Sequence, residues 1–334
     1  MQESRQVGFA LAVGENVAST ALLTGGLLAV WDDGDGSVEE LLGMLQGNAN
    51  GHGWKLLRDG IDVTRQAAQH VAVYDASKIL NSRKTPWSCA AQAAGTFPLV
   101  QCGKKARAAL HAMQLDEAAH CRLNKLTEEQ RVRVWLACAL ASDHSMILLS
   151  GRPEKDLRKA LKGKLTAIYH AKSMEETADA DRVLVLHGHH LDHICTPWQL
   201  LHAPKSLYVA QKADRGEMLP VRVAARNARG GLALDMDGLV IPVSTDDGEM
   251  PVIGASGWLW VERDNIRATK QIVNTFHLSA VVLDNANTVV AQLPNGAKLH
   301  CQCDEKITQG ERIFVTWDVA KARFLQDECK DERM

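Results

Sequence analysis

Two patterns of apolar residues follow one another between Thr127 and Leu149. A helical spacing places four residues on one face and leaves Arg131 and Arg133 off it: Val132, Leu136, Ala139 and Leu140. The next apolar run, Met146 to Leu149, is continuous. Such a run is typical of a parallel strand that is covered on both faces. The pattern therefore predicts an amphipathic helix followed by a buried central strand.

A second strand and helix are predicted near the start of the chain. Leu27 to Trp31 is a short apolar run, and Glu39 to Leu45 has helical character. The turn between them, residues 32–38, is DDGDGSV. A strand, a glycine-rich turn and a helix form the setting of a phosphate-binding loop.

The pattern changes along the rest of the chain. A strand and a turn are predicted at residues 55–64, further strands at 71–74 and 165–169, and helices between Pro86 and Lys125. From about residue 213 the apolar period becomes two, with hairpin turns at Asp237-Gly238 and Asn295-Gly296. Many short strands with such turns favour an all-β barrel of the oligonucleotide/oligosaccharide-binding (OB) type. The predicted strands lie at 219–223, 232–235, 239–243, 258–261, 279–283, 289–293, 298–301 and 312–317.

Composition narrows the class of protein. With 334 residues, 46% of them hydrophobic and 23% charged, the chain is long enough for two globular domains. A formal net charge of -2 gives no electrostatic support for a nucleic-acid partner. The 8 cysteines form no C-x-x-C pair, which favours reduced thiols and a cytoplasmic protein. No apolar run reaches membrane-spanning length, and Glu3 argues against a signal peptide.

Two stretches of the sequence contain residue types that bind metal ions, but neither predicts a metal site. The turn looks like part of an EF-hand, but setting Gly36 as its sixth residue puts Trp31 first and Leu42 twelfth, so both end ligands fail. A solvated acidic turn is favoured. A second cluster lies at His187, His189, His190, His193 and Cys195. In a strand after a turn, His189, His193 and Cys195 would share one face and suit Zn²⁺. A polar surface hairpin is favoured, and no metal site is predicted.

Several runs of residues resemble one family. Residues 130–140, QRVRVWLACAL, resemble the Q-R-x-R-V-x-L-A-x-A-L run of ATP-binding cassette (ABC) ATPases. Residues 181–211 resemble the D-R-I-x-V-M…G-T-P-x-E-I-Y…F-V-A block of importer ATPases for polyamines, iron and sugars. Residues 261–267 stand where the transport-associated (TOBE) barrel of these subunits commonly has R-P-E-x-I.

This resemblance implies a two-domain fold. Residues 1–212 are expected to form an α/β P-loop NTPase-like (ABC ATPase) domain, with a helical subdomain at about 86–125. Residues 213–334 are expected to form an all-β OB-like (TOBE-type) barrel.

The residues that carry the family's chemistry are replaced. The signature L-S-G-G-Q appears as L-T-E-E-Q at 126–130, and the Asp-Glu after the central strand is Ser150-Gly151. The phosphate-gripping Lys is Val38, the hydroxyl that ligates Mg²⁺ is Glu39, and the Q-loop Gln is Asp75. The switch histidine falls at Ala171; His170, one place away, is expected to have no partner carboxylate. Phosphoryl transfer needs these groups, so we expect ATP hydrolysis to be lost.

A vestige of the nucleotide site is implied by the same alignment. Phe9 falls on the aromatic that stacks on adenine, and the remaining positions of the vestige are Gly34, Gly36 and Ser37. No catalytic residue is assigned, and binding of ATP and Mg²⁺ is expected to be weak or absent.

The resemblance leads to one preferred function and two alternatives. The preferred function is a non-catalytic regulatory or structural subunit of a transport-type complex. Its expected partners are a second copy or a related ATPase, and a membrane permease, which would place it in the cytoplasm and at the inner face of the membrane. The first alternative is an active importer ATPase that energises uptake of a small solute with a divergent site. The second is a small-solute sensing module that acts through the C-terminal barrel.

Overall fold

The computed structural model describes residues 9–13, 25–48, 53–73, 84–95, 98–149, 151–152, 161, 165–226, 231–244, 251–272, 276–284 and 288–326. The chain divides into two compact units, Met1–Pro197 and Trp198–Met334.

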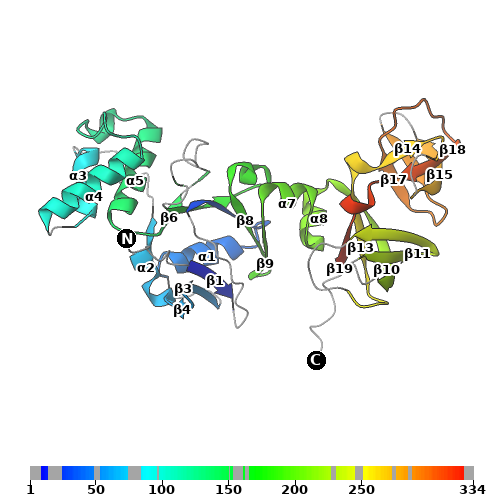
Figure 1. The fold of residues 1–334 in the computed structure, drawn as a ribbon, viewed down its shortest axis with the longest axis horizontal. Coiled ribbons are helices and arrows are strands. Elements are labelled where there is room, and N and C mark those ends of the chain that lie inside the picture. The colour runs from blue at the N-terminus through cyan, green and yellow to red at the C-terminus, as the bar shows by residue number, and fades with distance from the viewer. Residues whose placement is uncertain are drawn as a thin grey trace, which may run out of the picture. The chain divides into compact units, whose positions relative to one another are not determined.

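A six-stranded sheet is the centre of the first unit (Figure 1). All neighbouring strands are parallel except the last pair, β8 and β9, which is antiparallel. Every residue of β2 and β6 is buried, and β6 has a neighbour on each side. The prediction of a covered interior strand at Met146–Leu149 is therefore confirmed. In sheet order the strands are β5 (Val71–Val73), β6 (Met146–Leu149), β7 (Thr166–Ala171), β2 (Gly26–Trp31), β8 (Arg182–His187) and β9 (His190–Cys195).

Helix α1 (Ser37–Leu45) and a small antiparallel sheet share one hydrophobic core with the large sheet. The small sheet consists of β1 (Phe9–Val13), β3 (Trp54–Arg58) and β4 (Ile61–Asp62). Leu28 and Val30 of β2 pack in this core with Leu41 and Leu45 of α1, all at most 2% exposed. Full burial of such a side chain contributes roughly 1.5–3 kcal/mol. This packing fixes α1 directly after the turn that follows β2.

A helical segment follows β5 and a short helix, α2 (Ala67–His70). Its helices are α3 (Pro86–Ala93), α4 (Leu99–Ala112) and α5 (Glu128–Ala141). Helix α5 begins with a capping box, in which Thr127 and Gln130 each accept a hydrogen bond from the other's backbone N–H. The sequence predicted Val132 and Leu140 on the buried face, but both are half-buried. Instead Val134, Ala137 and Ala141 are buried, because α5 packs against α3, α4 and β6 together.

The second unit contains two five-stranded antiparallel sheets whose residues share one hydrophobic core. All eight strands predicted there are confirmed, and Asp237-Gly238 turns between β11 and β12. The sequence missed two short strands, β14 and β19, and two helices, α7 (Pro197–His202) and α8 (Leu207–Ala213). One sheet is β12 (Leu239–Ser244), β11 (Gly231–Met236), β10 (Gly216–Arg226), β13 (Ser256–Glu262) and β19 (Arg323–Gln326). The other is β14 (Arg267–Thr269), β18 (Arg312–Thr316), β15 (Leu278–Asp284), β16 (Val289–Gln292) and β17 (Lys298–Cys301).

None of the helices formed by the described residues is long and apolar enough to span a membrane.

Candidate functional site: the turn between β2 and α1

The carboxyl ends of β7, β2 and β8 lie at one edge of the large sheet, because these three strands are parallel neighbours. Ligands of open α/β sheets bind at this edge. The turn after β2 lies there, and so do His170 near the end of β7 and His187 at the end of β8. The sheet order therefore brings the turn after β2 together with two segments that lie more than a hundred residues later in the sequence.

The carboxylate of Asp32 occupies the inside of the turn. Its Oδ1 accepts the backbone N–H of Gly34 at 3.1 Å, and its Oδ2 accepts that of Val38 at 3.0 Å. The residue is 3% exposed. In a phosphate-binding loop the backbone N–H groups point at the ligand. Here two of them already point at a carboxylate of the same chain.

Two glycines give the turn its shape. Gly34 has φ 90° and Gly36 has φ 89°, in the left-handed region that L side chains rarely adopt. Gly36 precedes the first residue of α1, and its lack of a side chain leaves that helix without a side-chain cap from this position. Asp35 takes over part of this role, because its Oδ1 accepts the N–H of Ser37 at 2.8 Å. The turn is thus held by its own aspartates.

The β8–β9 hairpin is fastened to the turn by hydrogen bonds. Oδ2 of Asp35 accepts the backbone N–H of Gly188 at 2.8 Å, and Oγ of Ser37 accepts that of His189 at 3.0 Å. The His189 ring contacts Oε2 of Glu40 at 2.9 Å. Partial burial opposes ionisation of Asp35, but the hydrogen bonds from Ser37 and Gly188 outweigh it and hold its pKa below the ordinary value. Asp35 is consequently an anion near neutral pH.

His170 lies between two carboxylates. Its Nε2 is 3.8 Å from Oδ1 of Asp32, and its Nδ1 is 3.8 Å from Oε1 of Glu39. The prediction that this histidine has no partner carboxylate is therefore wrong. The parallel pairing of β2 with β7 places Val30 opposite His170, two residues before the turn begins at Asp32. The sequence did contain one indication of this arrangement, because a histidine near the end of an apolar strand can reach the edge of the sheet where the neighbouring turn lies.

The residues proposed for a nucleotide site are distributed between the core and the turn. Gly34, Gly36 and Ser37 lie together in the turn, and Ser37 is fully buried. Phe9 lies in β1, is 2% exposed, and packs against the His70 ring with centroids 5.3 Å apart. Arg58 lies over the Phe9 ring at 5.9 Å. The vestigial site remains a prediction, and its aromatic member is a core residue.

The replaced positions differ in their surroundings. Val38, where the family has the phosphate-gripping Lys, is fully buried in the core shared with β2. The Glu39 side chain, where a hydroxyl would ligate Mg²⁺, is 66% exposed. Gly151 is exposed, while Ser150 and Asp75 lie outside the described residues, as does most of the region 154–164 that follows the central strand.

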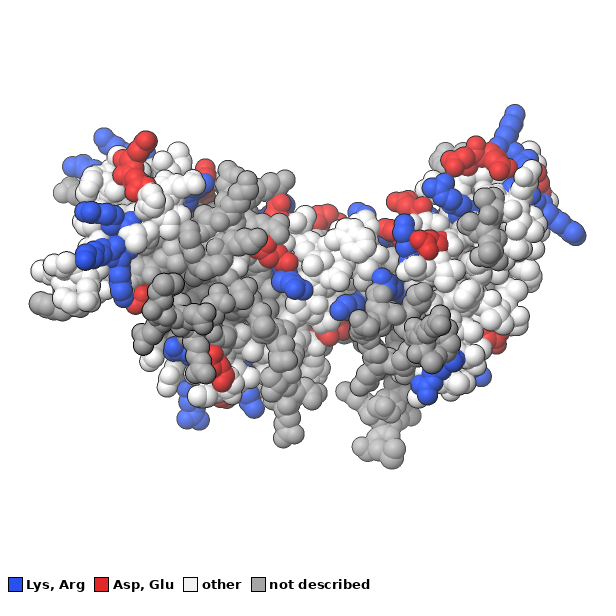
Figure 2. All heavy atoms as spheres, viewed as in Figure 1, with Lys and Arg blue, Asp and Glu red and all other residues white. Residues whose placement is uncertain are grey.

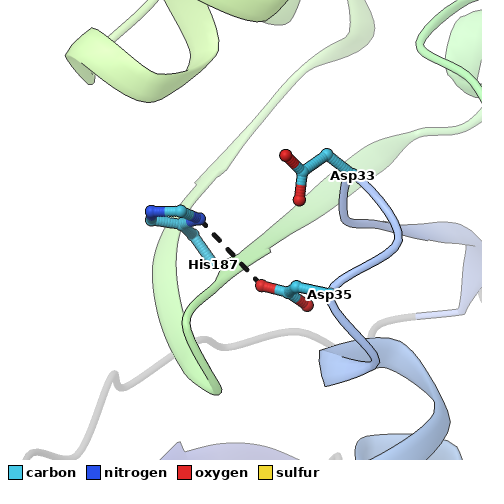
Figure 3. A group of neighbouring side chains, drawn as sticks. All are labelled: Asp33, Asp35 and His187. Carbon is cyan, nitrogen blue, oxygen red and sulfur yellow. Dashed lines mark ion pairs between the residues drawn. The ribbon is translucent and has the colours of Figure 1, made fainter.

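The suggested zinc ligands of the hairpin do not assemble. His189 pairs with Glu40, His193 with Asp192, and Cys195 is fully buried. Among the described residues, one other group has three donor atoms within 4.8 Å of one another: Asp33, Asp35 and His187 (Figure 3). Sequence reasoning missed this group because its members belong to two separate elements.

Curated proteins that are similar to this chain in sequence include import ATP-binding proteins. No known family profile matches the chain. The spermidine/putrescine import ATP-binding protein PotA of Bacillus anthracis is 29% identical over 126 residues, covering 34% of this chain and 38% of that protein. The sulfate/thiosulfate import ATP-binding protein CysA of Mannheimia succiniciproducens is 30% identical over 121 residues, covering 32% of this chain and 34% of that protein.

Two solved structures of ABC transporter proteins are similar to part of this chain. CbiO1 from Clostridium perfringens, part of the ABC transporter complex CbiONQ, has a TM-score of 0.47 and 14% identity, covering 62% of this chain and 95% of that chain. A bacterial Atm1-family ABC exporter with ATP bound has a TM-score of 0.42 and 19% identity, covering 62% of this chain and 38% of that chain. On the sequence relatives, the chain resembles the ATP-binding subunits of bacterial ABC importers.

Proposed function

We propose that this chain is a non-catalytic homologue of ABC importer ATP-binding subunits, acting as a regulatory or structural subunit of a transport complex. One observation carries the proposal: the Asp32 carboxylate accepts the N–H groups of Gly34 and Val38 inside the turn where a phosphate would bind. The resemblance to importer subunits supplies the biological setting.

Charge explains why this arrangement disfavours a nucleotide. A phosphate placed in the turn would meet Asp32 in place of free N–H donors, with Asp33 and Asp35 beside it. One like-charge pair near 4 Å costs on the order of 4 kcal/mol at an effective dielectric of 20. That energy corresponds to about a thousandfold in affinity. Buried Val38 offers no compensating cation.

The proposed architecture is an ABC ATPase-like domain at residues 1–212, with its helical subdomain at about 86–125, and a TOBE-type OB barrel at 213–334. The parallel sheet with its buried β6 supports the first part, and the antiparallel sheets around one core support the second. The proposed domain boundary, after residue 212, lies further along the chain than the boundary between the two compact units, which follows Pro197.

The proposed partners are a second copy or a related ATPase, and a membrane permease that docks on the helical segment. Leu99 and Val100 at the start of α4 are 73% and 71% exposed. They line a pocket of about 610 Å³ together with Trp87, Lys104 and Arg107. Figure 2 shows basic side chains gathered over the α3–α5 region. Exposed apolar residues rimmed by charges are typical of protein-binding surfaces.

The decisive experiment compares the natural turn with a rebuilt one. The variant Asp32→Gly, Ser37→Gly, Val38→Lys, Glu39→Thr restores the family's loop residues. By calorimetry, we expect no detectable MgATP binding by the natural chain and at least about tenfold tighter binding by the variant. Asp33→Gly alone removes one neighbouring charge but leaves the Asp32 carboxylate on the N–H groups of Gly34 and Val38, so binding should remain undetectable. Phosphate release above the blank by the natural chain, abolished by changing Ser150, would instead support the active-ATPase alternative.

Solute binding by the second unit is a second candidate, favoured by a pocket of about 670 Å³ on β15, β16 and β18. Apolar Leu293, Ile313 and Phe314 line it, with Gln292 and Arg312 as polar groups. Such a combination is usual in small-molecule sites. A thermal shift of the full chain by an anionic solute, lost in Arg312→Ala, would support this function. No shift across a panel of anionic solutes would count against it.

A further inference from the structure

Asp33, Asp35 and His187 converge on one point from two elements (Figure 3). One donor atom of each lies within 4.8 Å of the other two, and Oδ2 of Asp35 is 4.0 Å from Nδ1 of His187. The two aspartates belong to the turn after β2, and the histidine ends β8. Asp33 and His187 are exposed and the Asp35 side chain is 24% exposed, so an ion from solution can reach all three.

The two elements are fixed against each other without any ion. Asp35 accepts the N–H of Gly188 in the β8–β9 hairpin, and Ser37 accepts that of His189. The two segments that carry the donor atoms are therefore already fixed against each other. An ion has only side chains left to order, and this small ordering cost favours binding.

The local charge also favours a cation. Residues 32–40 contain five carboxylates, at positions 32, 33, 35, 39 and 40, and no Lys or Arg. Their mutual repulsion is relieved when a positive charge enters the group. The imidazole of His187 adds a nitrogen ligand, which magnesium and calcium sites made of oxygen ligands do not use.

We propose that Asp33, Asp35 and His187 bind one divalent transition-metal ion, with Zn²⁺ the best match, and that water completes its coordination. Zn²⁺ accepts two carboxylate oxygens and one imidazole nitrogen at about 2.0–2.2 Å, which in tetrahedral geometry places the ligand atoms about 3.3 Å apart. The donor atoms, now within 4.8 Å of one another, must close in by up to about 1.5 Å, which rotation of the exposed Asp33 and His187 side chains supplies while Asp35 keeps its hydrogen bonds. The bound ion cross-links the turn to the hairpin.

The test uses the full chain, stripped with EDTA and desalted, and counts bound Zn²⁺ by equilibrium dialysis. The chain has 13 histidines and 8 cysteines, and Zn²⁺ can bind to others of them as well. The informative quantity is therefore the difference in bound Zn²⁺ between the natural chain and each variant. Asp33→Asn and His187→Gln should each lose one equivalent of Zn²⁺ and the rise in melting temperature that Zn²⁺ gives the natural chain. The matched control is His111→Gln with Asp116→Asn, an exposed pair with Nδ1 and Oδ2 3.0 Å apart on the helical segment. The control should lose neither.

An unchanged Zn²⁺ count in both site variants, or an equal loss in the control, overturns the proposal. Melting in EDTA shows whether each variant folds. Should one fail to fold, Mn²⁺ added to the natural chain gives an independent result. Its paramagnetism should broaden the imidazole signals of His187 before those of His111 in a histidine-labelled sample. If the His187 signals are not among the first to broaden, the proposal is wrong.

Discussion

The backbone N–H of Val38 donates to Oδ2 of Asp32 across 3.0 Å, while the Val38 side chain is fully buried in the core. A position aligned with a phosphate-gripping Lys thus serves the fold in two ways: its amide ties the turn together, and its side chain fills the space under α1. The charge that the family directs at a nucleotide is absent, and an anion of the chain itself takes the inside of the turn.

Removing the Asp32 carboxylate should destabilise the first unit. Asp32→Ala leaves the N–H groups of Gly34 and Val38 without their acceptor, at an expected cost of about 1–3 kcal/mol. Asp32→Asn keeps one carbonyl oxygen and should cost less. Urea unfolding measures the loss in the free energy of unfolding. Hydrogen exchange across residues 32–45 shows whether the destabilisation is located at the turn and α1. Asp33→Ala, an exposed neighbour, should change stability by less than about 0.5 kcal/mol; an equal loss there would contradict this account.

A methyl group at Gly257 should separate β13 from β19. A Cβ at this position would lie 2.5 Å from the backbone oxygen of Leu325 and 2.6 Å from the Phe324 ring. A backbone atom cannot move aside cheaply, so Gly257→Ala should destabilise the second unit by about 1–3 kcal/mol in calorimetry. Gly103→Ala, in the interior of α4 with nothing within 4 Å, should stabilise by about 0.5–1 kcal/mol. A neutral Gly257→Ala would show that β19 is not packed this closely.

The cysteines should differ widely in reactivity. Burial raises the pKa of Cys138 and of Cys301 to about 12, whereas Cys121 is exposed. At pH 8 the thiolate fraction of a thiol with that pKa is on the order of one part in ten thousand. Among the cysteines of the described residues, we expect iodoacetamide to label Cys121 first in the folded chain, as mass spectrometry of its peptides can show. Labelling of Cys138 at the rate of Cys121 would contradict its burial.

Mild acid should lower the stability of the first unit through a half-buried histidine, His144. Burial, with the nearby His70 charge, lowers the pKa of His144 below its ordinary 6.5. Above that pH the ring is neutral in both states. As pH falls, the unfolded chain takes up the proton first, so stability decreases until the folded pKa is passed. His144→Gln should flatten the fall in melting temperature between pH 7 and pH 5. The exposed His111→Gln should leave it unchanged, and a steep fall that survives in His144→Gln would contradict the assignment.

Local sequence patterns were sufficient to predict part of the fold. Met146–Leu149 is recognisable as a buried strand because four consecutive apolar residues need cover on both faces. Asp237-Gly238 marks a hairpin because it tolerates positive φ. Strand β19 and the buried face of α5 were missed or misplaced, because each depends on which distant segments pack against it.

By itself the sequence determined the strand, turn and helix at residues 27–45, because residue types and spacing are sufficient for that prediction. Its resemblance to ABC ATPases implied that the Lys, hydroxyl and Asp-Glu groups of phosphoryl transfer are replaced. Only the tertiary structure decided that Asp32 turns inward to accept the Val38 amide, that His170 lies between Asp32 and Glu39, and that His187 meets Asp33 and Asp35. The physical reason is the parallel order β7-β2-β8, which brings three strand ends to one edge of the sheet although more than a hundred residues separate β2 from β7 and β8 along the chain.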